Sequence, residues 1–209
     1  MSFREESETT NAPRHDKFGE ALEFLKRYLK NPVETMRRLP DWDWPMLLIF
    51  YSSLAGICGL AGGALSRHFT QMISGAIVFP ITSTVGAFIA TGFLYYTFAF
   101  FFHREVAIKT IFTIVILSLL PFLALSVISA WLMPLNVLGF FISGLLLVVG
   151  LAENTHVDRR RIFKLVAIIY LIYVVFWIFN TINSRTEKEK YKDRSSPEAI
   201  ETLKKEMNN

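Results

Sequence analysis

The middle of this sequence lacks almost all the charge that catalysis or transport would use. None of its long apolar segments carries a charged residue well inside it, and Cys58 is the single cysteine, so no intramolecular disulfide is possible. Neither an H-E-x-x-H zinc pair nor a glycine-rich phosphate loop is present. Proton relays and intramembrane proteases usually need an ionisable group in the membrane interior. We therefore expect no catalytic residue, no metal site and no cofactor.

What the sequence does have is apolar length. About 20 residues of helix span a hydrocarbon core about 30 Å thick. Five segments are long enough, at residues 45–65, 73–102, 110–132, 135–152 and 162–182. They do not alternate apolar and polar residues as barrel strands do, so we predict an all-α fold, a polytopic bundle of five transmembrane helices. The second segment is longer than needed, which predicts tilt, a bend at Pro80 or an interfacial first turn.

The placement of lysine and arginine predicts how the bundle is oriented. Eight of them precede the first span, two lie in the second loop and four at the fourth, against one in the first loop and none in the third. This bias predicts a cytoplasmic N-terminus. The charged tail, with seven basic residues, would then lie outside. An even number of crossings, with 135–152 re-entrant, would instead place the tail inside.

The regions that flank the spans differ in character. We expect residues 1–15 to be disordered, 16–40 to form an amphipathic cytoplasmic helix region, 45–182 to be the membrane domain, and 183–209 to be a charged tail. Apolar residues recur at helical spacing on one face between residues 16 and 30, namely Phe18, Ala21, Leu22, Leu25, Tyr28 and Leu29. Such a helix would lie in the headgroup layer as an interfacial helix, or it would pack on the bundle or on a second copy.

Polar residues at the span ends form a candidate cluster on the cytoplasmic side. Its members are His103, Arg104, Glu105, Glu153, His156 and Asp158. Basic residues that could contact lipid headgroups are Arg37, Arg38, Arg159, Arg160 and Arg161. The cluster could converge on a phosphate headgroup or a metal ion. The alternative is that these loops are polar because they meet water.

Small residues repeat every fourth position in the first span, at Ala55, Gly59 and Gly63. This spacing lets two helix backbones approach closely. It predicts either packing within the bundle, which we favour, or self-association through this span.

Three motifs give the chain a family resemblance. Asn31-Pro32-Val33-Glu34-Thr35-Met36-Arg37-Arg38-Leu39, the stretch from His103 to Pro121, and Gly150-Leu151-Ala152-Glu153-Asn154-Thr155-His156 resemble parts of the prokaryotic Yip-type domain, of the Ypt/Rab-interacting-protein family. Together they cover about residues 31–182. The resemblance implies five helices and a cytoplasmic N-terminus. Eukaryotic members act in Golgi and endoplasmic reticulum traffic through small GTPases. The short N-terminal part indicates a bacterial inner-membrane relative.

These observations predict a non-enzymatic, multi-pass membrane protein that organises or binds partners. We expect its partners to be the lipid bilayer and other membrane proteins or further copies of itself, and no nucleic acid. The alternative function is a small transporter or lipid-handling protein that uses the cytoplasmic polar cluster.

Overall fold

The computed structural model describes residues 14–65, 69–128 and 134–194, and all secondary structure within them is helical. Five stretches of helix are long and apolar enough to cross a membrane, at Trp44–Leu65, Met72–Phe102, Ile108–Ile128, Leu135–Thr155 and Arg159–Phe179. The predicted all-α, five-span architecture is confirmed. Most of residues 1–15, which were predicted to be disordered, lie outside the described residues. The part of the predicted charged tail after residue 194 lies outside them as well.

The helices follow the chain in a simple order. They are α1 (Arg14–Lys30), α2 (Pro32–Arg37), α3 (Trp44–Leu65), α4 (Phe69–Thr97) with the π-helical turn η1 (Phe98–Phe102), α5 (Ile108–Ser118), α6 (Leu120–Ile128), α7 (Pro134–Thr155) and α8 (Arg159–Arg194). The fourth span is one continuous helix of 22 residues, which is long enough to cross about 30 Å of hydrocarbon without turning back.

The described residues divide into two units at Ile162. From Phe163 onward, α8 is described by itself. Its membrane-crossing stretch is largely apolar, and Leu171, Val175 and Phe179 are each more than half exposed, whereas Val166 is buried. Exposed apolar side chains on a helix long enough to span the hydrocarbon core belong in lipid. Beyond its membrane-crossing stretch, α8 continues to Arg194, inside the region predicted as a charged tail.

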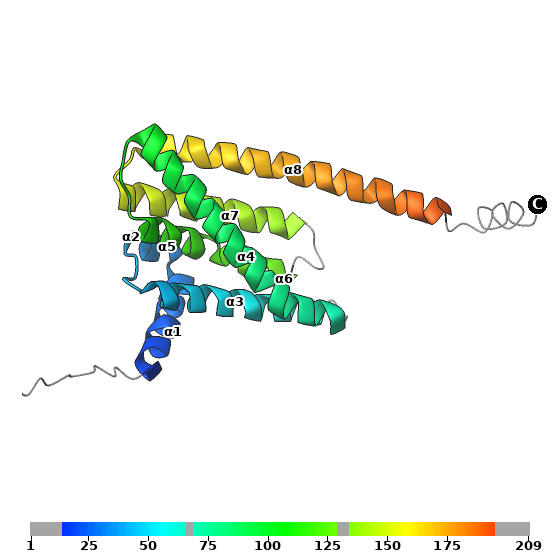
Figure 1. Cartoon of the computed structure of the whole chain (residues 1–209), viewed down its shortest axis with the longest axis horizontal. Helices are drawn as coiled ribbons and strands as arrows, with labels where there is room; N and C mark the ends of the chain where they lie inside the picture. The colour runs from blue at the N-terminus through cyan, green and yellow to red at the C-terminus, as the bar shows by residue number, and fades with distance from the viewer. Residues whose placement is uncertain (1–13, 66–68, 129–133, 195–209) are drawn as a thin grey trace, which may run out of the picture. The chain divides into compact units, whose positions relative to one another are not determined.

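Two of the spans, α3 and α4, form a tight hairpin. Gly59 and Gly75 lie backbone to backbone, so that a Cβ on either would collide with the carbonyl group of the other. Farther along, the hydroxyls of Ser52 and Thr84 are 3.2 Å apart. From this junction α4 runs obliquely to α3 (Figure 1). Pro80 lies inside α4, which continues as helix on both sides of it.

The third span is the centre of the first unit and is broken in its middle. Every residue of α5 from Ile111 to Ser118 is buried, against α2, α3, α4 and α7. Pro121, the second residue of α6, has no N–H to donate to the Leu117 carbonyl. Tyr28 Oη donates to that carbonyl oxygen at 2.8 Å instead. On the other side of the break, the Phe122 N–H donates to Ser143 Oγ of α7 at 3.3 Å. Side chains from other helices therefore satisfy the backbone groups at the break.

Candidate functional site

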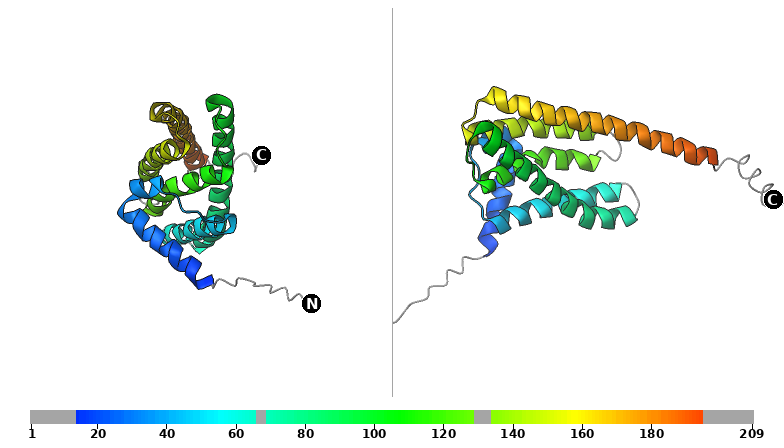
Figure 2. Two further views of the ribbon diagram at one scale, coloured as in Figure 1. Left: turned by 90° about the vertical axis from the view of Figure 1, so that its left-hand side faces the viewer. Right: turned by 45° about the horizontal axis from the view of Figure 1, so that its top comes forward.

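One end of the bundle joins segments that are far apart in sequence. Here α1 and α2, the link from residue 38 to 43, the start of α5 and the last turn of α7 come together. We call it the α2 end. Figure 2 shows α1 lying crosswise to α3 at this end.

The centre of the α2 end is a contact between Met36 and Gly150. Met36 has no exposed surface, and a Cβ on Gly150 would meet Met36 Cε at 2.5 Å and Ile114 Cγ2 at 2.8 Å. The absence of a side chain at Gly150 therefore makes the hole that Met36 fills. This contact inserts the short helix α2 between α5 and α7.

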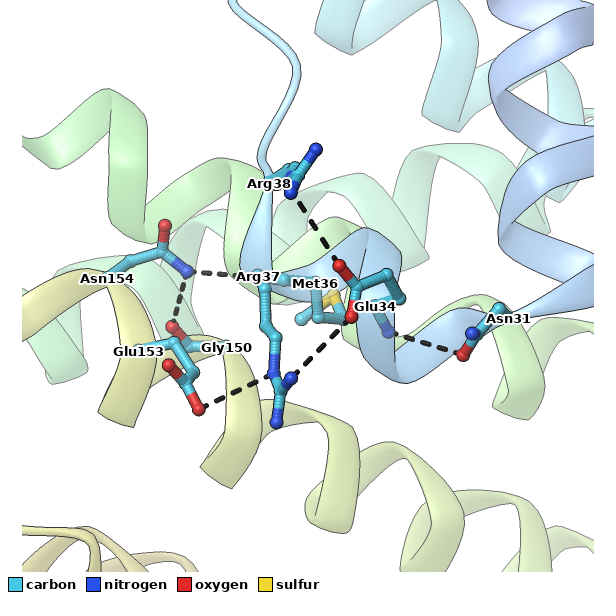
Figure 3. Close-up of polar contacts among 8 residues, drawn as sticks. All are labelled: Asn31, Glu34, Met36, Arg37, Arg38, Gly150, Glu153 and Asn154. Carbon is cyan, nitrogen blue, oxygen red and sulfur yellow. Dashed lines mark hydrogen bonds and ion pairs between the residues drawn. The ribbon is translucent and has the colours of Figure 1, made fainter.

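Hydrogen bonds fix α2 in the same place (Figure 3). Asn154 Nδ2 donates to the Met36 carbonyl at 3.0 Å and to the Gly150 carbonyl at 2.8 Å, so one amide joins α7 to the end of α2. Asn31 begins α2, and its side-chain oxygen accepts from the Glu34 N–H at 3.4 Å. Pro32 at the first turn suits this start because its N–H would have no helical acceptor.

Ion pairs surround this contact on its exposed side. Arg37 lies between Glu34 and Glu153, with 3.6 Å to each carboxylate. Arg38 reaches Glu34 only at 4.0 Å, and its side chain is 88% exposed. Exposed pairs of this kind each contribute at most about 1 kcal/mol. They hold Arg37 more firmly than Arg38.

The α1 helix is attached to the bundle by a second set of contacts. Its buried face consists of Ala21, Phe24 and Tyr28. Phe24 packs edge-on against Trp42 at 4.8 Å between ring centroids, and Trp42 packs against Phe50 of α3 at 5.0 Å. Burial raises the pKa of the Tyr28 hydroxyl, which keeps it protonated as a donor. The helix predicted from its apolar face thus packs on the bundle along one edge.

The opposite edge of the predicted apolar face is not covered. Leu22 is 44% exposed and Leu29 72% exposed, and Val33 of α2 is 42% exposed. The face therefore divides into a buried edge and an exposed apolar edge, which we call the α1 apolar edge and define by Leu22, Leu29 and Val33.

The link into α3 is fixed by one close ion pair. Lys109 Nζ, at the start of α5, donates to Asp41 Oδ1 at 2.8 Å. This hydrogen bond and the positive charge of Lys109 lower the pKa of the Asp41 carboxyl below its ordinary value.

A groove of about 610 Å³ opens between α1, α2 and this link. Its floor is formed by Phe24 and Trp42, and the indole N–H of Trp42 donates to Glu20 Oε1 at 3.2 Å. Its walls carry both signs of charge and come from Glu20, Arg27, Lys30, Asn31, Glu34, Thr35, Arg38, Leu39 and Pro40.

The two histidines of the predicted polar cluster end helices. His103 follows η1 with φ 51°, and His156 follows α7 with φ 53°. Histidine is among the few residues other than glycine that tolerate this left-handed conformation, although it is uncommon. Across the described residues, no three histidine, cysteine or acidic side chains lie close enough to hold a metal ion.

The other members of the cluster are spread over separate contacts. Arg104 and Glu105 are exposed in the link before α5, while Glu153 pairs with Arg37. Asp158 begins α8, since its side chain accepts from the Arg160 N–H at 3.2 Å and its carbonyl accepts from the Arg161 N–H at 3.0 Å. Arg159, Arg160 and Arg161 are exposed in the first turn of α8.

A comparison with known families decides what this architecture is. Residues 26–180 match the Yip1 domain. The chain belongs to the Yip1 domain family. Among the curated proteins and the solved structures, no significant match to the chain was found.

Within the Yip1 domain, two of the motifs that carried the sequence resemblance form one contact. The motif from Asn31 to Leu39 supplies α2 with Met36 at its centre, and the motif from Gly150 to His156 supplies the last turn of α7. The α2 end is therefore where the most recognisable parts of this Yip1 domain meet.

Several residues of the Yip1 domain that matter here were not predicted as site residues. Asn154 and Met36 lay inside the motifs, but spacing alone does not show that an amide in one reaches a carbonyl in the other. Tyr28 was placed on the apolar face without a partner. Pro121 was the available signal, because it leaves the Leu117 carbonyl in need of a donor.

Proposed function

We propose that this Yip1 domain protein is a non-enzymatic membrane protein that binds other membrane proteins, or further copies of itself, through the α2 end. Its bundle holds α1 and α2 by buried contacts that involve Met36, Phe24 and Tyr28. A surface held in this way needs little ordering when a partner binds, which lowers the entropic cost of association.

The α1 apolar edge carries this proposal. Leu22, Leu29 and Val33 remain exposed, whereas Ala21, Phe24 and Tyr28 of α1 are buried. An apolar edge beside a membrane entry point contacts either lipid or a protein partner. We propose a protein partner, with lipid contact as the competing outcome of the test.

Site-specific photo-crosslinking in native membranes tests the proposal. A photoreactive residue at Leu22 or Leu29 should give protein adducts of defined mass, whereas the same group at Glu105, which is exposed in a link at the same end, should not. Lipid adducts alone at positions 22 and 29 would contradict partner binding at this edge.

We further propose that the α2 end faces the cytoplasm of a bacterium and that the bundle lies in the inner membrane. The excess of lysine and arginine in the segments at this end supports the orientation. The resemblance to the prokaryotic Yip-type domain supports the membrane. The alternative function in transport or lipid handling relied on convergence of the six polar residues, and the contacts of the described residues distribute them over separate places.

A further inference from the structure

The groove between α1, α2 and the link to α3 is lined by more cations than carboxylates. Three cations line it, Arg27 and Lys30 from α1 and Arg38 from the end of α2. Arg27 and Lys30 are three residues apart, so they lie on one side of α1.

The carboxylates of the groove are already engaged. Glu20 accepts the indole N–H of Trp42, and Glu34 pairs with Arg37 at 3.6 Å. Across the part of the chain that the structure describes, no carboxylate pairs with Arg27 or Lys30, and the pair between Arg38 and Glu34 is stretched to 4.0 Å. The lining therefore holds three cations against the two carboxylates Glu20 and Glu34, an excess of one positive charge.

The floor of the groove is apolar and rigid. Phe24 and Trp42 are only 6% and 4% exposed, and they pack against each other edge to face. Trp42 lies two residues before the start of α3, so the groove lies where the chain enters the first span. A ligand here can place an anionic group on the cations and apolar atoms against Leu39 and Pro40, which line the groove and are only half-buried.

We propose that this groove binds a phosphate-bearing ligand, with the phosphate held by Arg27, Lys30 and Arg38 and the adjoining apolar part resting against Leu39 and Pro40. The inference goes beyond partner binding by the α1 apolar edge, because it uses another side of α1. The same chemistry is offered by the headgroup of an anionic phospholipid and by a soluble phosphorylated compound.

The proposal also revises which basic residues contact headgroups. Arg37 was expected to do so from its position before the first span. It lies between two carboxylates at 3.6 Å, so a phosphate would have to displace both. Arg27 and Lys30 need no such displacement.

Native mass spectrometry of the full-length protein in neutral detergent tests the proposal, with phosphatidylglycerol titrated against phosphatidylcholine. The R27Q/K30Q variant should lose at least about tenfold in phosphatidylglycerol affinity, since charge-assisted hydrogen bonds are lost. The matched control K26Q/R104Q removes the same charge from the same end of the bundle but outside the groove, and should keep the affinity within about twofold of the unmodified protein.

Competition with inorganic phosphate distinguishes a soluble phosphorylated ligand from a phospholipid headgroup. If millimolar phosphate displaces phosphatidylglycerol and R27Q/K30Q weakens phosphate itself, the natural ligand is a soluble phosphorylated compound. If phosphate does not compete, the ligand is a lipid headgroup. Equal losses in the two double variants, or equal binding of both lipids, would overturn the proposal.

Discussion

At the scale of single residues, the α2 end depends on what Gly150 lacks. Met36 Cε and Ile114 Cγ2 fill the space that a Cβ would need. Met36 Cε ends a flexible side chain, but both side chains are fully buried, and the Ile114 methyl group is fixed by its branched Cβ. Interiors packed to this density respond to a single methyl group.

Gly150→Ala should therefore destabilise the protein by about 1–3 kcal/mol through overpacking. Unfolding in mixed micelles, monitored by circular dichroism, measures the change. Gly86→Ala is the control, because a Cβ at Gly86 meets nothing within 4 Å. Met36→Ala should lose less stability in the Gly150→Ala background than in the unmodified protein, because the new methyl group occupies part of the space that Met36 leaves. If the variant were as stable as the control, the packing described for Met36 would be wrong.

The pair between Asp41 and Lys109 predicts a pH dependence. The pKa of the Asp41 carboxyl is lowered in the folded protein, so the pair stabilises the fold above the carboxyl's ordinary pKa, and this contribution is lost as pH falls through the lowered pKa. Asp41→Asn should remove it at neutral pH. Unfolding titrations from pH 7 to about pH 3 should show the two proteins converging in acid. Asp43→Asn, at an exposed neighbouring carboxylate, should not reproduce this convergence.

At the scale of elements, α1 and the broken third span depend on one another. The break at Pro121 leaves a buried carbonyl on Leu117, and Tyr28 reaches it from another helix. An N-terminal helix that packs this way is part of the bundle. Its removal would take the side-chain donor away from a buried acceptor in α5.

Tyr28→Phe should cost about 1–3 kcal/mol, the penalty of a buried carbonyl without a donor. Hydrogen exchange should also rise in α1, because its strongest polar contact is lost. Tyr96→Phe serves as the control, since Tyr96 is 62% exposed on α4. Unchanged stability together with unchanged exchange would show that this hydrogen bond contributes nothing.

The close approach of α3 and α4 predicts that adding a Cβ at Gly59 destabilises the hairpin. A Cβ on Gly59 would collide with the backbone of Gly75, which cannot move aside as a side chain can. Gly59→Ala should therefore destabilise the protein by about 3 kcal/mol or more. Gly56→Ala, in the same helix, meets its nearest atom at 3.8 Å and should be tolerated. If Gly59→Ala left the monomer as stable as before and only abolished self-association, the small residues of this span would serve an interface between copies.

At the scale of the whole molecule, the number of crossings fixes which side each end occupies. Five spans place the α2 end and the stretch after α8 on opposite sides. Reporter fusions in the link around Glu105 and after Arg194 should report cytoplasmic and external locations, respectively. Both reporters on one side would require an even number of crossings.

The sequence was sufficient for the architecture because membrane insertion depends on local composition. Apolar length located all five spans: the first two agree to within one residue, and the other three differ by a few residues at one or both ends. The contacts of the α2 end could not be predicted from the sequence in the same way. Met36 and Gly150 are 114 positions apart, and their meeting depends on how α2, α5 and α7 pack, which no local pattern encodes. Residues with a local signal, such as Asn31 before Pro32, are those that sequence reasoning could place.

The burial of α5 has a consequence for biosynthesis. Ile111 to Ser118 belong to a span that is long and apolar enough to enter a bilayer, yet all eight of these residues are buried within the protein. Since α7 supplies Gly150 and Ser143, the third span stays partly uncovered until the fourth has been synthesised. A ribosome stalled before α7 emerges would leave an incompletely wrapped intermediate, with α2 lacking the wall against which it docks. Assembly of this protein is thus completed late, by a segment that closes around one already inserted.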